Sequence, residues 1–89
     1  MLFMIIEHFH AGKVKEIYKR FEEKGRLMPE GLHYVNSWID EEIKTCYQVM
    51  ESETEDKLME WINNWKDLTD FEVIKVISSA EAKEKVLHS

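Results

Sequence analysis

The chain has 89 residues, a hydrophobic content of 44% and a formal net charge of −6 from 18 acidic and 12 basic residues. A chain of this size forms one small domain whose own core is near the lower limit of stability, so a partner subunit often helps. The acidic balance argues against a nucleic-acid-binding surface, because such a surface needs clustered Lys and Arg, whereas the bases here are interleaved with acids.

Neither a transmembrane segment nor a signal peptide is expected. The longest apolar run, Met1–Ile6, is far shorter than the roughly 20 residues that a membrane helix needs. It also lacks the positively charged start and the small-residue cleavage site of a signal peptide. The single cysteine, Cys46, permits no intramolecular disulfide, which fits a reducing cytoplasm and excludes a cysteine-rich zinc site. We therefore expect a cytoplasmic protein with neither nucleic acid nor membrane as a partner.

The first third of the chain predicts a strand followed by a helix. Leu2–Phe9 is nearly all apolar and too short for a typical helix, so it suits a central strand that is buried on both faces. After a break at residues 11–12, apolar side chains recur with helical spacing at Val14, Ile17, Tyr18 and Phe21. This spacing is typical of an amphipathic helix. Gly25 is placed to cap the helix, and Pro29 prevents its continuation.

The stretch Gly31–Glu51 predicts a β-hairpin with an acidic turn at residues 40–42. Four polar residues alternate with strand formers within it: Asn36, Ser37, Thr45 and Gln48. A three-residue turn would place on one face Tyr34, Asn36, Trp38, Cys46 and Gln48, and on the other Val35, Ser37, Thr45, Tyr47 and Val49. A register shifted by one residue would instead pair Asn36 with Tyr47, and the sequence leaves both registers open.

The last part of the chain predicts a helix, a strand and a short final helix. Thr54 is the expected N-cap of a helix whose apolar stripe consists of Leu58, Trp61, Ile62 and Trp65. Residues 67–70 form the connection to a strand at Phe71–Ile77. Ser78 and Glu81 match a capping box for a last helix that runs to about Leu87. Its sparse apolar content indicates a helix that is peripheral or bound to a partner.

These elements predict an α+β fold of the ferredoxin-like type, β-α-β-β-α-β, with an antiparallel sheet in the order 4-1-3-2 and both main helices on one face. A single domain would span residues 1–89, with its core at 1–77 and a C-terminal helix or tail at 78–89. The uncovered face of the sheet would expose a larger apolar patch than monomers usually tolerate. We expect a second copy to pack on it, giving a dimeric α/β barrel as a homodimer or a higher even oligomer.

The chain resembles a family of short prokaryotic proteins in four segments: IIEHF, GLHYVNSW, CYQVMES and WINNWKDLTDFEV. That family is described only as a domain of unknown function, with an expected dimeric α/β-barrel fold. The resemblance implies a ferredoxin-like dimer and brings neither an activity nor a catalytic residue. More distantly, the architecture is similar to dimeric-barrel enzymes such as cofactor-independent quinone-forming monooxygenases, muconolactone isomerases and haem-degrading monooxygenases. A shared fold does not determine function.

The polar residues of the hairpin are the main candidates for a ligand site. Two amides beside an aromatic wall suit a small, largely apolar molecule that carries one or two oxygens. The expected ligand-binding residues are Tyr34, Asn36, Trp38, Cys46, Gln48 and Trp65. The alternative is that the amides hydrogen-bond to backbone or water inside the barrel. Trp61 and Trp65 have the spacing of a core stripe, which favours packing over a cofactor wall, and Cys46 is expected to be an inert buried thiol.

The histidines give a weaker signal. His8 ends a buried strand, where its pKa can be tuned, so it is the best candidate for catalytic acid–base chemistry. His8 and His10 would point to the same side of a continuing strand, as metal ligands can, but no spacing of a known metal site is present. We predict neither a metal nor a cofactor.

Two functions fit this pattern. The first is a dimeric barrel that binds a small, largely apolar molecule, as a cofactor-independent monooxygenase or isomerase. The second is a non-enzymatic dimerisation or regulatory interaction module whose C-terminal helix contacts a partner.

Overall fold

The seven elements of the computed structural model follow the predicted order. The structure describes residues 1–88, and residue 89, the end of the predicted tail, lies outside the described residues. The elements are β1 (Leu2–Phe9), α1 (Val14–Lys24), β2 (Leu32–Ile39), β3 (Thr45–Ser52), α2 (Glu55–Asn63), β4 (Thr69–Val76) and α3 (Ser79–His88). Gly25 ends α1 with a φ of 68°, as expected of a C-terminal glycine. The Ser78 hydroxyl accepts the Glu81 backbone N–H at 3.1 Å, as expected of a capping residue.

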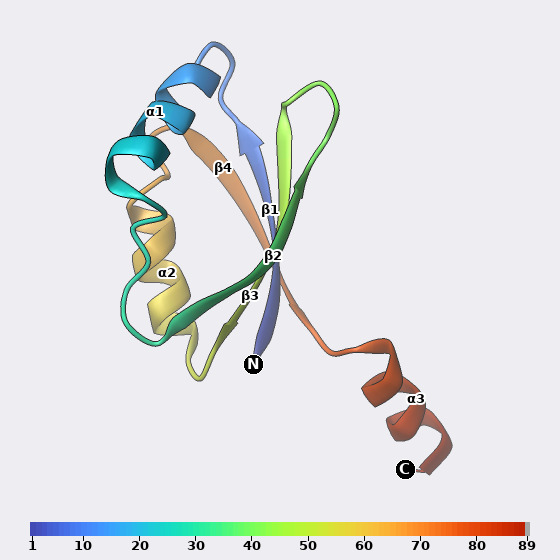
Figure 1. The fold of residues 1–89 in the computed structure, drawn as a ribbon. Helices are drawn as coiled ribbons and strands as arrows, with labels where there is room; N and C mark the ends of the chain where they lie inside the picture. Colours follow the sequence, from blue (N-terminus) through green and yellow to red (C-terminus); the bar gives the residue numbers. More distant parts are fainter. Residues whose placement is uncertain (89) are drawn as a thin grey trace.

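The sheet has the order β2-β3-β1-β4, and every neighbouring pair is antiparallel. The predicted ferredoxin-like topology is therefore confirmed. The helices α1 and α2 lie together on one face of the sheet, which we call the helix-covered face (Figure 1). The almost wholly apolar strand β1 is central, because it is the one strand with little polar side chain to offer to solvent.

The core lies between the helix-covered face and the two helices. Alternate residues of β1 point into it, and Phe3 and Ile5 are almost fully buried. The buried cluster comprises Phe3, Ile5, Ile17, Leu32, Met50, Leu58, Trp61, Ile62, Trp65 and Leu68. Each large apolar side chain buried in this way contributes about 1.5 to 3 kcal/mol relative to exposure.

The hairpin differs from both expected registers. Trp38 pairs with Tyr47 and Ile39 with Cys46, and the pairing shifts at a bulge between Tyr34 and Asn36. The two strands are joined by five residues rather than three.

Two local features explain the longer loop and the shifted register. The Asp40 carboxylate accepts the backbone N–H groups of Lys44 and Thr45, both at 2.7 Å, and Ile43 has a φ of 58°. The side chain of Asp40, the first residue of the loop, therefore holds the other end of the loop through hydrogen bonds. The bulge adds one unpaired residue to β2. Side chains therefore still alternate between the two faces of the sheet on each side of the bulge, but the pattern is offset by one residue across it.

The strand β4 begins at Thr69, two residues before the expected start. The Thr69 hydroxyl donates to the His8 carbonyl at 2.9 Å. The threonine is almost fully buried, and this bond extends the pairing of β4 with the end of β1.

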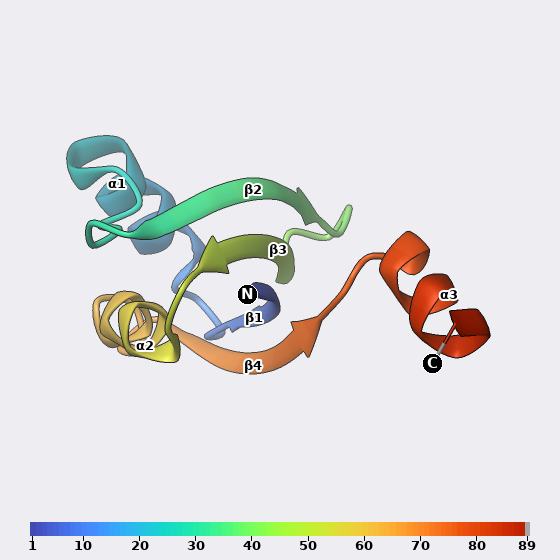
Figure 2. The same cartoon turned by 90° about the horizontal axis from the view of Figure 1, so that it is seen from below.

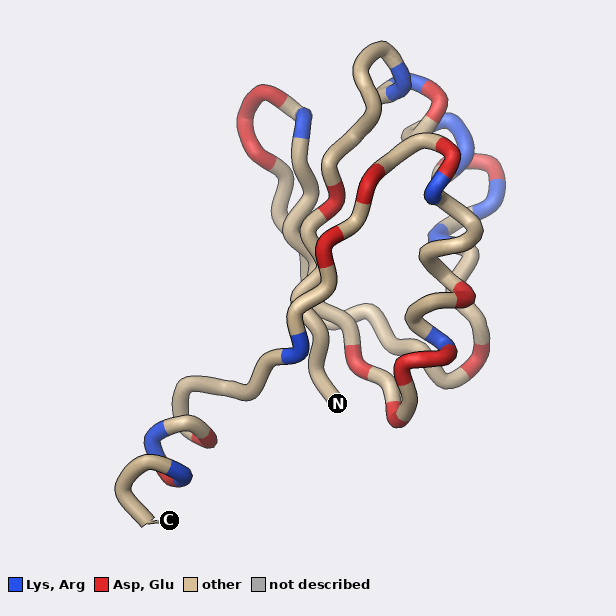
Figure 3. Tube along the Cα trace, turned by 180° about the vertical axis from the view of Figure 1, so that it is seen from behind, with Lys and Arg blue, Asp and Glu red and all other residues tan. Residues whose placement is uncertain are grey.

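The opposite face of the sheet is uncovered, and we call it the open face. Its apolar side chains are Leu2, Met4, Ile6, Trp38, Tyr47, Val49, Ile74 and Val76. Trp38 is 56% exposed and Ile74 49% exposed. Lys and Arg are interleaved with Asp and Glu along the helices (Figure 3).

The helix α3 stands clear of the sheet, on the side away from α1 and α2 (Figures 1 and 2). None of its described residues is buried, and Val86 and Leu87 are 78% and 63% exposed. None of the helices within residues 1–88 is long and apolar enough to cross a membrane.

Candidate functional site

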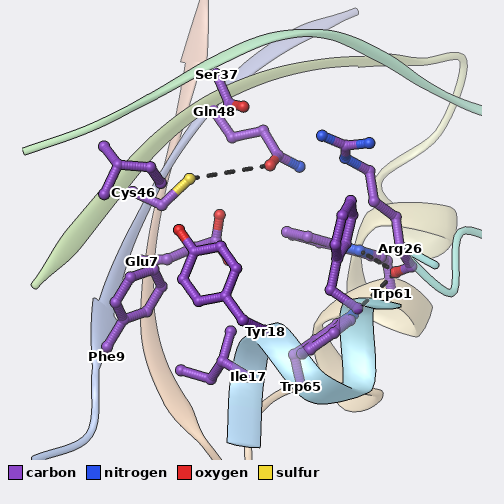
Figure 4. A pocket seen from close by; sticks show the side chains of 12 residues that line it. Glu7, Phe9, Ile17, Tyr18, Arg26, Ser37, Cys46, Gln48, Trp61 and Trp65 are labelled. Carbon is purple, nitrogen blue, oxygen red and sulfur yellow. Dashed lines mark hydrogen bonds between the residues drawn. The ribbon is translucent and has the colours of Figure 1, made fainter. Parts of the chain in front are cut away.

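A cavity of about 260 Å³ lies between the helix-covered face and the two helices (Figure 4). We call it the pocket, and it is lined by Glu7, Phe9, Ile17, Tyr18, Phe21, Arg26, Ser37, Ile39, Cys46, Gln48, Trp61 and Trp65. Its walls are mainly aromatic and aliphatic, with a few polar groups among them, which is the composition of small-molecule sites. A second hollow of about 550 Å³ opens beside Met1. Within residues 1–88, none of its lining side chains has a buried polar atom without a hydrogen-bond partner.

Glu7 is the buried acid of the pocket. Its side chain comes from β1 on the same face as Phe3 and Ile5, and the residue is only 8% exposed. Among the described residues, Oε2 has no hydrogen-bond partner. Burial raises the pKa of Glu7 from 4.5 to about 7, against the weaker opposing effects of the neighbouring Cys46 thiol and the charge of Arg26. A carboxyl group with this pKa can both accept and donate a proton near neutral pH.

Gln48 provides a second buried polar group without a full set of partners. It is 5% exposed and lies directly across from Ser37. Its Oε1 accepts from the Cys46 thiol at 4.0 Å, whereas its Nε2 has no partner among the described residues. An unpaired buried amide donor costs free energy unless a ligand or water accepts from it.

Cys46 and Tyr18 add two neutral groups. Burial and the neighbouring Glu7 carboxylate raise the pKa of Cys46, so its thiol stays protonated and is a poor nucleophile. Burial, reinforced by Cys46 and Glu7, also raises the pKa of Tyr18. Both groups are therefore hydrogen-bond donors at neutral pH.

Arg26 enters the pocket from the loop between α1 and β2. The indole N–H groups of Trp61 and Trp65 both donate to its backbone carbonyl, at 3.0 and 2.9 Å. The Asn64 amide donates to the next carbonyl, that of Leu27, at 3.0 Å. Three side chains at or just after the end of α2 thus hold this loop.

The guanidinium of Arg26 lies against two aromatic rings. Its Cζ is 3.8 Å from the ring centroid of Tyr34 and 5.0 Å from that of Phe21. Such cation–π contacts orient a cation without neutralising its charge. No carboxylate of the described residues forms an ion pair with Arg26.

The family model described as "Domain of unknown function (DUF3303)" matches residues 1–88. The chain belongs to the DUF3303 family. This confirms the family resemblance expected from the sequence. Among curated proteins, none matches this DUF3303 chain.

Two crystal structures share the fold of this DUF3303 protein. One is a protein from Agrobacterium tumefaciens, with a TM-score of 0.53 and 14% identity over 89% of this chain and 96% of that one. The other is an uncharacterised NIPSNAP domain protein from Burkholderia xenovorans, with a TM-score of 0.52 and 11% identity over 89% and 97%. At these identities the likeness establishes the fold alone.

Three of the expected ligand residues of the DUF3303 chain meet in the pocket: Cys46, Gln48 and Trp65. Tyr34 lies at its edge, where it contacts Arg26 and its hydroxyl lies 2.7 Å from Ser37 Oγ. The expected grouping on one face is wrong for Asn36 and Trp38, which pair with Val49 and Tyr47 on the open face. The bulge in β2 causes this difference, because it reverses the alternation between Tyr34 and Asn36.

His8 also lies away from the pocket. Its side chain is 50% exposed and pairs with Glu72, while His10 pairs with Asp70 at 3.0 Å. Alternation along β1 turns His8 away from Glu7, so this predicted acid–base candidate does not line the pocket. Within residues 1–88, no group of three or more His, Cys, Asp or Glu side chains is arranged to hold a metal ion.

The predicted site residues did not include Arg26, and Glu7 was not predicted as an acid–base group. The sequence does give an indication for Glu7, because it is the one acid within the apolar run Leu2–Phe9. As an odd-numbered residue of the strand, it faces the same side as Phe3 and Ile5. The sequence gives no such indication for Arg26, because the position of this residue depends on how the loop after Gly25 packs against α2.

Proposed function

We propose that this protein binds a small, largely apolar molecule that carries at least one oxygen, and that Glu7 transfers a proton to or from it in the pocket. The observation that carries the proposal is that two buried polar atoms, Glu7 Oε2 and Gln48 Nε2, have no hydrogen-bond partner among the described residues and belong to side chains that line the same cavity. Buried polar groups are nearly always paired, and exceptions often mark binding or catalytic sites.

The residues suit chemistry of the isomerase type. In this scheme the Gln48 amide donates to a carbonyl oxygen of the ligand, which stabilises charge that develops there. The Glu7 carboxylate takes a proton from the neighbouring carbon and returns it to another carbon of the same molecule. Atoms and charge balance without a second substrate. A cofactor-independent oxygenation would begin with the same proton abstraction and would then need molecular oxygen as co-substrate.

The experiment is a binding and exchange assay with small lactones, cyclic enones and phenols. Calorimetry measures affinity, and NMR in D₂O measures exchange of the acidic C–H of each ligand that binds. We expect Gln48→Leu to weaken binding about tenfold or more, and Glu7→Gln to slow exchange by roughly 10²- to 10⁴-fold, the usual range for a lost general base. Oxygen uptake in the same samples would indicate the oxygenase route.

Two matched variants on the open face serve as controls. Asn36→Leu removes an amide, and Glu51→Gln removes a carboxylate, each outside the pocket. Neither should change affinity or exchange. The proposal is wrong if no member of the panel binds, or if the two controls have the same effect as the two pocket variants.

The open face supports a second function, assembly with another copy. Each half-exposed aromatic side chain leaves on the order of 100 Å² of surface in water. On the open face Trp38, Tyr47 and Ile74 are 42% to 56% exposed, and the other five apolar side chains are partly exposed. A standard stable interface buries roughly 800 Å² per partner, so an interface of that size would need α3, with its exposed Val86 and Leu87, as well as the sheet. We propose a sheet-to-sheet homodimer in which α3 of each copy lies against the other. Light scattering should give twice the chain mass at micromolar concentration, whereas a monomer would contradict the proposal.

A further inference from the structure

The pocket contains two hydrogen-bond donors that both lack an acceptor, the Arg26 guanidinium and the Gln48 side-chain amide. The Arg26 guanidinium forms no ion pair among the described residues, and Gln48 Nε2 forms no hydrogen bond among them. Both groups only donate. Figure 4 shows the nitrogen end of the Gln48 amide turned toward the side from which Arg26 enters. A ligand group that satisfies both must be an acceptor, and a negative charge suits it best.

The loop that carries Arg26 is fixed before any ligand arrives. Its carbonyl accepts from two indoles, and its guanidinium is held against the rings of Tyr34 and Phe21. The following residue, Leu27, has a φ of 57°, a conformation that a leucine adopts only where the surroundings enforce it. Because the Arg26 side chain is already held in place, it loses little conformational entropy when it binds an anion.

The cavity size limits what can accompany the anionic group. An apolar cavity of about 150 Å³ holds a benzene molecule, and this one measures about 260 Å³. The space therefore accommodates one six-membered ring with short substituents. The aromatic and aliphatic walls suit a ring better than a polyol.

We infer that the pocket selects a small cyclic carboxylic acid, whose carboxylate is held by Arg26 and Gln48 while its ring lies toward Glu7. This inference rests on the proposed function and specifies the class of ligand. It assigns Arg26 as the residue that sets specificity. Glu7 remains free for the proton transfer proposed above.

The anion should also change the protonation of Glu7. The charged or titratable side chains that surround Glu7 in the pocket are Tyr18, Arg26 and Cys46. Of these, Cys46 and Arg26 favour the ionised carboxyl, and Arg26 does so through its positive charge. A bound carboxylate offsets the positive charge, so Glu7 should take up a fraction of a proton when an acid binds near pH 7. A neutral ligand should bind without this uptake.

The test compares each acid with its own amide, which keeps the ring and removes the charge. Calorimetry would use benzoate with benzamide and phenylacetate with phenylacetamide. We expect the acid to bind at least tenfold more tightly than the amide, and this preference to vanish in Arg26→Met. Lys24→Met, the same kind of change at the exposed end of α1, should keep the preference. Titrations in two buffers of different ionisation heat measure the proton uptake, which Glu7→Gln should abolish.

The outcomes separate this inference from the proposed function. If lactones and phenols bind but acids bind no better than their amides, the acid specificity is overturned and the proposed function stands. If neither acids nor neutral ligands bind, both are overturned. If acids keep their advantage in folded Arg26→Met, the role of Arg26 is overturned. Should that variant fail to fold, the acid-to-amide ratio and the proton uptake of the native protein still decide.

Discussion

At the scale of single residues, the unusual feature is a carboxyl group in the most apolar strand of the sheet. An ionised carboxylate buried without a partner is costly, and proteins usually avoid the cost by keeping the group protonated. Glu7 follows this rule, since burial raises its pKa to about 7. The protein therefore keeps at this position a group that changes charge at physiological pH, where an apolar residue would be more stabilising.

The stability of the ligand-free protein should therefore fall as pH rises. Between the unfolded pKa of 4.5 and the folded value of about 7, the unfolded chain releases a proton that the folded chain still holds. The contribution of Glu7 to the free energy of unfolding is fully present below pH 4.5 and is lost as the pH rises through this window. Above the window it does not change further. The difference amounts to about 3 kcal/mol.

Urea unfolding at pH 5 and pH 8 measures this loss. We expect Glu7→Gln to flatten the profile and to be more stable than the native chain at pH 8. Glu23→Gln, at an exposed position of α1, should keep the native slope. A native profile that is flat or rises from pH 5 to pH 8, with no difference in Glu7→Gln, would contradict a raised pKa.

A second residue-scale prediction concerns the two indoles that share one acceptor. Trp61→Phe or Trp65→Phe alone leaves the Arg26 carbonyl with the other donor, so each should cost only about 1 to 2 kcal/mol of unfolding free energy. The double variant removes both donors and should exceed the sum by about 1 kcal/mol or more.

Urea unfolding followed by circular dichroism tests this coupling without relying on tryptophan fluorescence. Trp61→Phe combined with Glu23→Gln, which share no partner, should be additive within about 0.5 kcal/mol. Additive costs for the two tryptophans would show that the shared carbonyl does not couple them. The double variant should also lose part of its preference for acids over amides, because the loop of Arg26 is then less firmly held.

At the scale of elements, the sequence predicted what periodicity controls. The near-continuous apolar run of β1 and the helical spacing in α1 and α2 led to the correct topology, and Gly25 marked the correct helix end. The register of the hairpin did not follow from periodicity, because it depends on one bulge and on hydrogen bonds from Asp40. The pocket was accordingly predicted in part: Cys46 and Gln48 were found, while Asn36 and Trp38 were placed on the wrong face.

The helix α3 gives a prediction of its own. An isolated helix of 10 residues is marginal in water. The helix α3 stands on the side of the sheet away from α1 and α2 (Figure 2), and its Val86 and Leu87 are exposed. Its stability should therefore come from a partner. Removing residues 79–89 should leave the unfolding free energy of the monomer within about 0.5 kcal/mol of the native value, but should raise the dimer dissociation constant at least tenfold.

Sedimentation velocity over a range of concentrations measures that constant. The double variant Val86→Ser with Leu87→Ser should reproduce most of the effect of the deletion. Lys83→Ser, on the same helix, serves as the matched control and should not weaken association. An unchanged dissociation constant after the deletion would remove α3 from the interface.

At the scale of the whole molecule, the two proposed functions use opposite faces of one thin sheet. The pocket lies on the helix-covered face. The open face carries the proposed interface. Since the central strands β1 and β3 contribute alternate residues to both faces, assembly should stiffen the sheet without placing a partner residue in the pocket. Binding and dimerisation should therefore be separable by mutation.

This separation can be tested by placing a single charge either on the open face or on α2. Trp38→Glu and Ile74→Lys each bury a charge in the proposed interface, and a desolvated charge without a partner is strongly unfavourable. We expect either variant to be monomeric at micromolar concentration and to bind the preferred ligand with an affinity within about threefold of the native protein. Met59→Lys puts the same charge on α2, outside the open face, and should remain dimeric. Variants that stay dimeric would refute the open face as the interface, while monomers that no longer bind would show that the pocket depends on assembly.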